Sequence, residues 1–362
     1  MNNLTVENLY KQIGEILDPD INSSLSALNA IKDIKVMNNQ IDISLELEQP
    51  LFGIASAMKG LISTTINSTA PDAIVNVKIT EKFFRNKATG TLREVKNIIA
   101  VASGKGGVGK SSVAANLALA LAKTGAKVGI LDGDVYGPSQ PTMFGVVGER
   151  LPAEDLPDGK TIAYPVEKYG VKIASMGFIM KRDEAAIVRG PMLAGYFSML
   201  FEQISWGELD FLIFDLPPGT GDIQLTLTQK IPLTGAVIVT TPQEISIADV
   251  RRSIAMFRRV NVDIIGVIEN MSYFSPAELP DNKYYIFGQG GGTLIAKEFE
   301  TEMLGEVPLD IEFRQGTDSG RPILISAPDS VQSGIFMNLA NKILSKVRSL
   351  NAVSDEELKI TI

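Results

Sequence analysis

Residues 104–111 read Gly104-Lys105-Gly106-Gly107-Val108-Gly109-Lys110-Ser111, and this stretch decides the fold that we predict for the chain. It satisfies the pattern G-x-x-x-x-G-K-S of the Walker A phosphate-binding loop. An apolar segment precedes it at residues 97–103 (NIIAVAS), and a segment of helical character follows at residues 112–124 (SVAANLALALAKT). Because a Walker A loop lies between a strand and a helix, these flanks support the prediction.

Each residue type in this loop suits the binding of a polyphosphate. Glycines let successive backbone N–H groups turn toward phosphate oxygens, since a Cβ atom would clash with the ligand or forbid the required φ. The N-terminus of the following helix adds partial positive charge at the same point. Lys110 is placed to reach the β and γ phosphates, and the Ser111 hydroxyl is placed to bind Mg²⁺. The loop therefore predicts a site for ATP and Mg²⁺.

The same glycines allow an alternative interpretation. Gly104, Gly106 and Gly109 also spell G-x-G-x-x-G, and Asp132 ends the next predicted strand, as in a dinucleotide-binding Rossmann site. Such a turn has no need of the Lys-Ser pair that ends the loop, and residues 215–222 (DLPPGTGD) add a second motif of a triphosphate site. A nucleoside triphosphate is therefore favoured over NAD, and a purely structural glycine loop is the third alternative.

Composition limits the class of protein. With 362 residues, 45% of them hydrophobic and 21% charged, the chain is expected to be globular and long enough for two domains. It contains no apolar run of about 18 residues, and its N-terminus is neither basic nor followed by an apolar segment, so we expect a cytoplasmic protein with no membrane partner. The net charge of -8 argues against nucleic acid as a partner, because phosphate neutralisation needs clustered Lys and Arg.

The sequence contains neither cysteine nor histidine. Without thiolate or imidazole it cannot build a Cys-ligated iron–sulfur site, a structural zinc site or a Ser–His–Asp triad. Metal binding is left to oxygen ligands, which suit Mg²⁺.

Residues 1–80 are predicted to form a small α+β domain, residues 81–96 a linker, residues 97–350 the P-loop domain and residues 351–362 an acidic tail. In the small domain, helical spacing occurs at residues 6–17 and 51–66, and strand patterns occur at residues 28–36, 40–48 and 74–80. Residues 81–96 are charged and lack a sustained period, which is typical of a linker.

From residue 97 onward, strand and helix patterns alternate, which predicts an α/β fold with a mostly parallel sheet covered by helices on both faces. Several of the strands are unbroken apolar runs, as strands buried on both sides should be. The predicted strands are residues 98–102, 127–131, 171–175, 211–214, 235–240, 264–269 and 303–307.

Carboxylates at strand ends complete the predicted site. Residues 211–215 (FLIFD) form an apolar strand that ends in Asp215, the form of a Walker B motif, whose carboxylate can orient the water shell of Mg²⁺. An Asp that ends a strand is more often a helix or turn cap, and only its pairing with the Walker A loop favours the metal role. Asp134 is the candidate for positioning the attacking water or a Mg²⁺-bound water. Gly219 is predicted to bring a backbone N–H to the γ-phosphate.

Residues 104–111, 131–139 (LDGDVYGPS) and 215–222 together resemble the deviant Walker A ATPases, a class that includes MinD and ParA. Within that class the chain is similar to the Mrp/ApbC iron–sulfur cluster carriers, and the resemblance covers residues 97–347. The N-terminal module, with Asp18-Pro19-Asp20, is similar to the small domain often fused to these carriers. Further matches are residues 189–191 (RGP), 241–244 (TPQE), 269–274 (ENMSYF) and 286–292 (IFGQGGG).

The resemblance implies a homodimeric ATPase with slow, dimer-dependent hydrolysis. Lys105 matches the signature lysine that reaches the partner's nucleotide, although a solvated loop lysine is the alternative, and Asn270 matches the residue that reads the adenine edge. The expected catalytic residues are Lys110, Lys105 and Asp134, and the expected metal ligands are Ser111, Asp134 and Asp215. The expected nucleotide contacts are Gly104, Lys105, Gly106, Gly107, Val108, Gly109, Lys110, Ser111, Ser112, Gly219 and Asn270.

The chain departs from the family where the family binds its cluster. After the ENMSYF segment the family carries a C-x-x-C pair, whereas residues 275–278 here read SPAE; near Pro50, residues 51–52 (LF) stand where relatives usually have a cysteine. Hydroxyl and carboxylate are hard donors and poor substitutes for thiolates toward iron–sulfur clusters. Two alternatives follow. The chain is a carrier or scaffold for iron–sulfur assembly whose thiolates are either lost or supplied by a partner, such as a client apoprotein or an assembly protein, or it is a positioning ATPase of the MinD/ParA type that carries no cluster.

Overall fold

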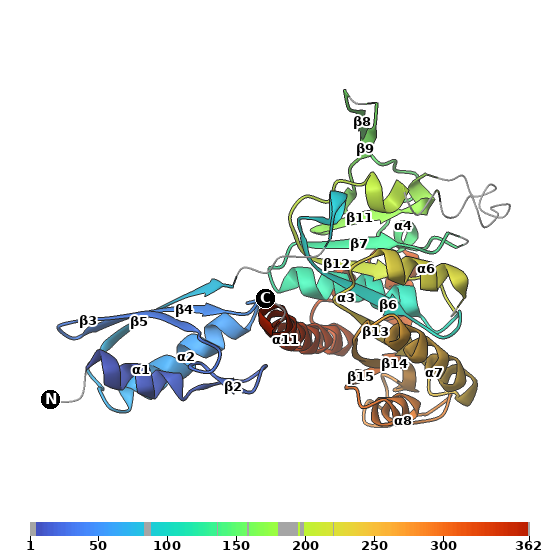
Figure 1. The fold of residues 1–362 in the computed structure, drawn as a ribbon. Helices are drawn as coiled ribbons and strands as arrows, with labels where there is room; N and C mark the ends of the chain where they lie inside the picture. The colour runs from blue at the N-terminus through green and yellow to red at the C-terminus, as the bar shows by residue number, and fades with distance from the viewer. Residues whose placement is uncertain are drawn as a thin grey trace. The chain divides into compact units, whose positions relative to one another are not determined.

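The computed structural model describes residues 5–82, 88–135, 137–157, 159–179, 195, 199–219 and 221–360, with the backbone alone for Asp222 and residues 354–360. The match at residues 189–191 lies outside the described residues. The chain divides into two compact units, one made of residues 1–85 and 344–362 and the other of residues 86–343 (Figure 1). We call them the N-terminal unit and the P-loop unit.

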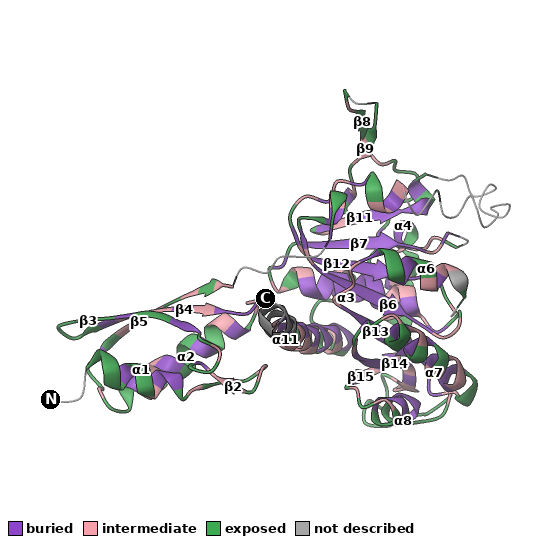
Figure 2. Ribbon diagram, viewed as in Figure 1, coloured by how far each residue is buried: buried purple, intermediate pink, exposed green. Residues whose placement is uncertain are grey.

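The N-terminal unit is a three-stranded sheet with two helices. The strand order is β3-β4-β5, with β3 antiparallel and β5 parallel to β4. Alternate residues of β4 are buried, including Ile41, Ile43 and Leu45, and they pack with Leu9 and Met58 of the helices (Figure 2). The elements are α1 (Val6–Gly14), β1 (Leu17–Asp18), β2 (Ser23–Ser24), β3 (Ile31–Met37), β4 (Gln40–Leu47), α2 (Ile54–Asn67) and β5 (Ile74–Glu81).

The C-terminal end of the chain belongs to the N-terminal unit. From Leu344 onward the last helix, α11 (Val331–Ile360), groups with this unit, whereas we expected residues up to 350 in the P-loop domain and a separate tail beyond. The physical reason is an ion pair: both terminal nitrogens of Arg348 donate to the carboxylate of Asp18, at 3.0 and 2.7 Å. Arg348 is only 1% exposed, and a second carboxylate, Asp20, lies 2.6 Å from its Nη1.

The expected linker at residues 81–96 is shorter than the charge pattern suggested. Strand β5 continues to Glu81, and Lys82 pairs with Glu48 in the N-terminal unit. On the other side, Leu92 and Val95 are buried in the core of the P-loop unit, and the first strand of its sheet begins at Val95. A few apolar residues spaced among charges are enough to anchor residues 88–95 to the core of the P-loop unit, and residues 83–87 lie outside the described residues.

The P-loop unit contains an eight-stranded sheet in the order β10-β11-β7-β12-β6-β13-β14-β15. Strand β10 is antiparallel to β11, and every other neighbouring pair is parallel. The predicted α/β fold is therefore confirmed, and each of the seven predicted strands is present: the strands at residues 171–175 and 235–240 have the predicted ends, and the other five have shifted ends. The strands are β6 (Val95–Ala102), β7 (Val128–Asp132), β10 (Val166–Lys168), β11 (Val171–Ser175), β12 (Leu209–Asp215), β13 (Gly235–Thr240), β14 (Ile264–Phe274) and β15 (Met303–Leu309).

Helices cover this sheet, whose central strands are buried along nearly their whole length (Figures 1 and 2). The helix after the P-loop, α3, is rich in alanine and leucine and is buried along most of its length, which lets its backbone approach β6, β7 and β12 closely. The helices are α3 (Lys110–Lys123), α4 (Gln140–Met143), α6 (Asp222–Lys230), α7 (Glu244–Arg259), α8 (Gly291–Glu298), α9 (Ile311–Asp318), α10 (Ile323–Ser326) and the start of α11; the 3-10 turns are η1 (Gly90–Leu92) and η2 (Met176–Phe178), and β8 (Ala153–Asp155) and β9 (Thr161–Ala163) form a separate hairpin.

The strand order brings the predicted site residues to one edge of the sheet. Strand β6 lies between β12 and β13, and the register pairs Asp215 with Val101 on β6 and with Asp132 on β7. On the next strand, Ser175 pairs with Asp132. Because all these strands are parallel, their carboxyl ends meet beside the loop that follows β6, which is where open α/β sheets bind ligands.

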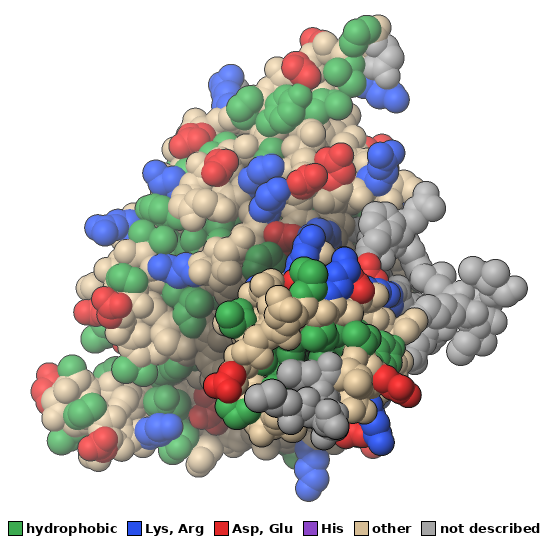
Figure 3. All heavy atoms as spheres, turned by 90° about the vertical axis from the view of Figure 1, so that its left-hand side faces the viewer, with side chains coloured by type: hydrophobic (Ala, Val, Ile, Leu, Met, Phe, Trp, Pro, Cys, Tyr) green, Lys and Arg blue, Asp and Glu red, His purple; other side chains and the backbone are tan. Residues whose placement is uncertain are grey.

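The surface carries charges of both signs. On the face drawn in Figure 3, Lys and Arg side chains are interspersed with Asp and Glu side chains. Among the helices of the described residues, none combines the length and the apolar character that a bilayer crossing requires.

Candidate nucleotide site

Glycines shape the loop between β6 and α3. Gly107 and Gly109 have φ of 81° and 80°, a region that L side chains rarely adopt. A Cβ atom on Gly109 would lie 2.2 Å from Asn270 Nδ2, and one on Gly104 would lie 2.4 Å from the backbone of Asp249. Steric exclusion therefore requires glycine at both ends of the loop.

The loop presents a row of unused hydrogen-bond donors. The backbone N–H of Val113 is the first to bond at the start of α3, to Gly109 O at 3.0 Å. Within the described part of the chain, the N–H groups from Gly106 to Ser112 have no hydrogen-bond acceptor. Backbone donors at a helix N-terminus, together with the positive end of the helix dipole, form a cradle for an anion. A polyphosphate fits this arrangement.

Lys110 and Asp215, predicted from two separate motifs, form a direct ion pair. Lys110 Nζ donates to Asp215 Oδ1 and also to Ser111 Oγ at 3.1 Å. The two charged side chains are 6% and 0% exposed. The structure thus brings together the Walker A lysine, the serine hydroxyl and the Walker B carboxylate. In this arrangement the carboxylate is the partner of the lysine.

Asp132 holds the loop that follows β7. Its Oδ2 accepts hydrogen bonds from Ser139 N at 2.9 Å, Gln140 N at 3.0 Å and Ser175 Oγ at 3.0 Å. Burial and the nearby charge of Asp215 raise the pKa of Asp132 to about 7. Because its oxygens are occupied by its own loop, Asp132 does not suit the ribose contact that the Rossmann interpretation needs.

Asp134 lies beside the segment that leaves β12. Its Oδ1 accepts from Gly137 N at 3.1 Å, and its backbone N–H donates to Asp132 Oδ1 at 3.2 Å. It lines a cavity of about 450 Å³ together with Pro217 and Pro218. This places Asp134 near the two prolines that follow Asp215 and Leu216, and its roles toward water and metal stay predictions.

Lys105 and Gly219 both form hydrogen bonds with Ser103, at the end of β6. Ser103 Oγ donates to Lys105 O at 2.9 Å, and Gly219 N donates to Ser103 O at 3.3 Å. Lys105 Nζ reaches Gln243 Oε1 at 3.4 Å. The N–H of Gly219 is therefore engaged with the strand end here, and the predicted contact to a γ-phosphate requires this long bond to exchange.

A groove of about 410 Å³ opens beside the loop, and sequence reasoning found only part of it. Asn270, which was expected there, is buried and donates from Nδ2 to Val108 O at 2.8 Å. The opposite wall comes from the end of β15 and from α9, where Phe313 stacks on Phe336 with ring centroids 5.6 Å apart and planes at 4°. The groove is lined by Gly109, Ser112, Asn270, Met271, Phe274, Pro308, Leu309, Asp310, Ile311, Phe313, Arg314, Thr317 and Asp318.

The wall of the groove that was not predicted, formed by the end of β15 and by α9, has one feature that is visible in the local sequence. Asp310 caps α9, with its Oδ1 accepting from Phe313 N at 2.6 Å, directly after the last strand. This marks a helix start at the carboxyl edge of the sheet, where ligands bind. Because this helix start is far from the P-loop in the sequence, no local pattern indicated that the two lie side by side.

Residues 274–284 include the SPAE stretch that stands in place of the C-x-x-C pair of the family, and hydrogen bonds within the segment hold it together. Phe274 and Tyr284 exchange backbone hydrogen bonds at 2.9 and 2.8 Å. Ser275 Oγ lies 2.7 Å from Pro280 O, and Lys283 Nζ lies 4.1 Å from the ring centroid of Tyr273. In the described residues no group of three or more His, Cys, Asp or Glu side chains is placed to hold a metal ion. The residues present do not fit an iron–sulfur cluster.

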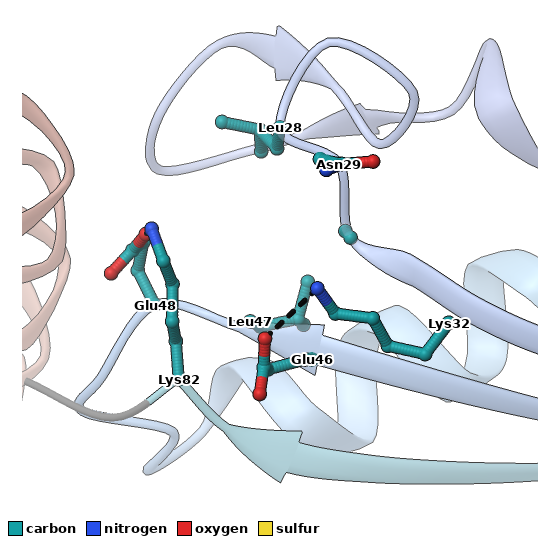
Figure 4. Close-up of a pocket in the computed structure, with 8 residues that line it drawn as sticks. Leu28, Asn29, Lys32, Glu46, Leu47, Glu48 and Lys82 are labelled. Carbon is teal, nitrogen blue, oxygen red and sulfur yellow. Dashed lines mark hydrogen bonds and ion pairs between the residues drawn. The ribbon is translucent and has the colours of Figure 1, made fainter. Parts of the chain in front are cut away.

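A smaller cavity, of about 70 Å³, lies in the N-terminal unit (Figure 4). Lys32 pairs with Glu46 at 3.0 Å, and Lys82 pairs with Glu48. Because these charged side chains neutralise one another, the cavity does not compete with the P-loop as a candidate site.

Comparisons with known proteins agree with the geometry of the P-loop unit. A family model described as NUBPL iron-transfer P-loop NTPase, of the ParA group, matches residues 94–344. An iron–sulfur cluster carrier protein from Synechocystis is 43% identical over 347 residues, which cover 95% of this chain and 98% of that protein. The chain belongs to the family of iron–sulfur cluster carrier P-loop NTPases.

Other members of the carrier family and related structures extend this result. The iron–sulfur cluster carrier protein of Escherichia coli is 40% identical over 332 residues, 91% of this chain and 89% of that protein. A nucleotide-binding protein from Archaeoglobus fulgidus, solved in complex with ADP, is 36% identical with a TM-score of 0.58, covering 68% of this chain and 94% of that one. The MinD ATPase of Pyrococcus furiosus, 23% identical with a TM-score of 0.51 over 68% of this chain and 98% of its own, shares the fold. The resemblance to the Mrp/ApbC carriers is confirmed.

Proposed function

We propose that this protein is a Mg²⁺-dependent ATPase of the iron–sulfur cluster carrier family that serves cluster assembly without ligating a cluster through its own side chains. The observation that supports the ATPase most strongly is the row of unbonded N–H groups from Gly106 to Ser112 beside the Lys110–Asp215 pair. These donors lie at the start of a helix beside a buried ammonium group, and two of them, on Gly106 and Gly107, are exposed, so the cradle is open to an anion from solution.

In this proposal, each residue of the site has a role in the binding or hydrolysis of ATP. Lys110 exchanges its carboxylate partner for the β and γ phosphates, and the backbone cradle holds the same oxygens. The Ser111 hydroxyl and Asp215 are hard oxygen donors of the kind that hold Mg²⁺, and the ion supplies charge neutralisation on the phosphates when it is bound. Asp134 positions the attacking water, because phosphoryl transfer depends on positioning more than on a strong base.

The groove beside the loop is suited to the base of the nucleotide. Phe313 and Met271 offer apolar surface, while Asn270 offers a polar edge at the inner end. Adenine has a flat apolar face and a hydrogen-bonding rim, so both features match ATP. The Archaeoglobus relative was solved with ADP, and we extend that ligand to this chain.

We further propose a cytoplasmic homodimer in which Lys105 reaches the nucleotide of the partner subunit and hydrolysis is slow. The bond from Lys105 to Gln243 is 3.4 Å long, so the ammonium group is weakly held and can be redirected at little cost.

The carrier role needs thiolates from elsewhere. Relatives across the family are named iron–sulfur cluster carrier proteins, yet this chain has no cysteine or histidine, and its segment from Phe274 to Tyr284 is closed by hydrogen bonds. We therefore assign the cluster ligands to a client apoprotein or an assembly partner, with ATP turnover driving the exchange. The 43% identity to a carrier along nearly the whole chain favours this function over a MinD-type positioning role.

Two lysines of the same loop test the ATPase. Lys110→Ala should abolish phosphate release and weaken ATP binding, because the ammonium group contacts the transferred phosphate. Lys105→Ala should retain ATP affinity and slow hydrolysis, because its proposed target lies in the partner subunit. Lys123→Ala, an exposed change at the far end of α3, is the matched control and should alter neither quantity. Unchanged phosphate release by Lys110→Ala would refute the ATPase assignment.

Anaerobic reconstitution tests the absence of cluster ligands. The purified protein, incubated with iron and sulfide and then desalted, is expected to retain neither element and to show no visible chromophore. A cysteine-containing carrier of the same family, treated in parallel, is the positive control. A stable chromophore on this chain would show that oxygen ligands suffice and that the partner requirement is wrong.

A further inference from the structure

Gln140, the first residue of α4, joins the two elements that carry the proposed Mg²⁺ ligands. Its Nε2 donates to Asp215 Oδ2 at 2.9 Å and to Ser111 O at 3.1 Å. The residue is fully buried, and its backbone N–H donates to Asp132 Oδ2 at 3.0 Å. One side-chain amide therefore links the C-terminal end of β12 to the first turn of α3.

The orientation of this amide is determined by its neighbours. The Asp215 carboxylate and the Ser111 carbonyl can only accept hydrogen bonds, so the NH₂ end of Gln140 must face both of them. Both hydrogens of the amide are then used. The opposite atom, Oε1, is buried and has no donor among the described residues, so the hydrogen bonds of this amide to the site come from its NH₂ end.

The two oxygens of the Asp215 carboxylate have different partners. Oδ2 is held by Gln140, while Oδ1 is held by Lys110. When Lys110 turns to a phosphate, Oδ1 loses its partner, and Asp215 is 0% exposed. The bond from Gln140 keeps the carboxylate from rotating and so keeps Oδ1 directed to the side that Lys110 has left. A buried carboxylate next to Asp132 would otherwise be both unpaired and unrestrained.

We propose that Gln140 is a positioning residue for Mg²⁺: it holds the backbone of Ser111 and the carboxylate of Asp215 at a fixed separation, so that the Ser111 hydroxyl and the carboxylate are in place to bind the ion. This inference rests on the proposed ATPase function. Partners that orient metal-binding groups typically change metal affinity by about 10- to 100-fold when they are removed.

The test compares ADP affinity with and without Mg²⁺ by isothermal titration calorimetry on the full chain. Gln140→Met keeps the length and volume of the side chain and removes both donors. The enhancement of ADP binding by Mg²⁺ is expected to fall about 10-fold or more. ADP affinity in EDTA should stay within about 2-fold, because the cradle and the groove are unchanged. In turnover assays, the Mg²⁺ concentration for half-maximal phosphate release should rise.

A matched control is Asn116→Leu, which removes another fully buried amide from the P-loop unit. Among the described residues, Asn116 Nδ2 donates within its own helix alone, to Ser112 O at 2.9 Å, and not to Asp215, so this variant should keep the wild-type Mg²⁺ enhancement. A general loss of packing would affect both variants and would lower ADP affinity in EDTA as well.

The possible outcomes separate the two proposals. If Gln140→Met retains the wild-type Mg²⁺ enhancement, the positioning role is overturned, whereas failure of the wild-type protein to bind ADP or ATP at all overturns the proposed function itself. Should Gln140→Met not fold, as judged by circular dichroism, Gln140→Asn retains the amide but shortens its reach. A reduced enhancement in that variant supports the inference, and an unchanged one contradicts it.

Discussion

At the scale of single residues, the phosphate site depends on contacts too short to admit a side chain. Asn270 Nδ2 supports the loop by bonding to Val108 O at 2.8 Å, and the same nitrogen lies 2.2 Å from the position of a Cβ on Gly109. The loop is therefore held against β14 through an atom that only glycine leaves room for. The left-handed φ of Gly109 adds a second requirement for glycine.

Gly109→Ala tests this requirement. The added methyl group must displace Asn270 and distort the cradle, so ADP affinity measured by calorimetry is expected to fall at least about 10-fold. Gly148→Ala is the matched control, because Gly148 also has positive φ, at 89°, but its Cβ would meet nothing within 4 Å. That variant should lose about 1 kcal/mol of unfolding free energy and no ADP affinity. Equal affinities for the two variants would contradict the steric argument.

At the scale of elements, the candidate site is assembled from strand ends and helix starts that are distant in sequence. The loop after β6 supplies the cradle, β12 supplies Asp215, and the groove is closed by β15 and α9. Helix α9 is short, and Phe313 stacks on Phe336 of α11. The groove wall therefore depends on the packing of α9 against α11, and not on the P-loop itself.

Phe313→Leu tests the groove separately from the cradle. The change keeps an apolar side chain and removes the flat ring, whose stacking on a base is worth about 1–3 kcal/mol. ADP affinity is expected to fall about 10-fold, while the affinity for pyrophosphate, which has no base, should be unchanged. Calorimetry with both ligands on the same preparation makes pyrophosphate the internal control. A parallel loss for the two ligands would show that the ring supports the fold and not the base.

At the scale of the whole molecule, the two ends of the chain form one unit. Arg348, near the C-terminus, is buried against Asp18 and Asp20, and Asn351 Nδ2 donates to Gln49 O at 3.0 Å. Desolvation by burial acts to lower the pKa of Arg348, but the hydrogen bonds that its guanidinium donates to Asp18 and Asp20, together with their negative charges, outweigh it and raise that pKa. The guanidinium thus stays charged in the core, and both carboxylates depend on it.

Arg348→Met tests this dependence. Removal of one partner from a buried ion pair typically costs about 3–5 kcal/mol, because the remaining charge stays buried. Hydrogen exchange should show loss of protection in β4 of the N-terminal unit, while β12 of the P-loop unit keeps its protection. Arg314→Met is the matched control: it breaks the exposed pair of Arg314 with Asp318 and should cost less than about 1 kcal/mol. Similar losses for the two variants would show that burial adds nothing at Arg348.

Several parts of the fold and site could be predicted because their signal is local. A few adjacent residues suffice to predict each of three features: the P-loop, the strand that ends in Asp215 and the strand at residues 235–240. The structure has the predicted loop or strand at each of these places. Strands of a parallel sheet are buried on both faces and therefore consist of nearly continuous apolar runs. This pattern allowed the α/β fold to be predicted. Asp132 was also noted, although its role as an anchor for its own loop emerged only from its hydrogen bonds.

By itself, the sequence determined that a phosphate-binding loop joins a buried strand to a helix, that a carboxylate ends a neighbouring strand, and that no thiolate or imidazole is available. Only the tertiary structure decided that Gln140 bridges Ser111 and Asp215, that α9 closes the groove opposite Asn270, and that Arg348 returns the C-terminus to the N-terminal unit. The reason is physical. Loop and strand preferences arise from neighbouring residues, whereas these contacts join residues far apart in the chain that only packing brings within hydrogen-bonding distance.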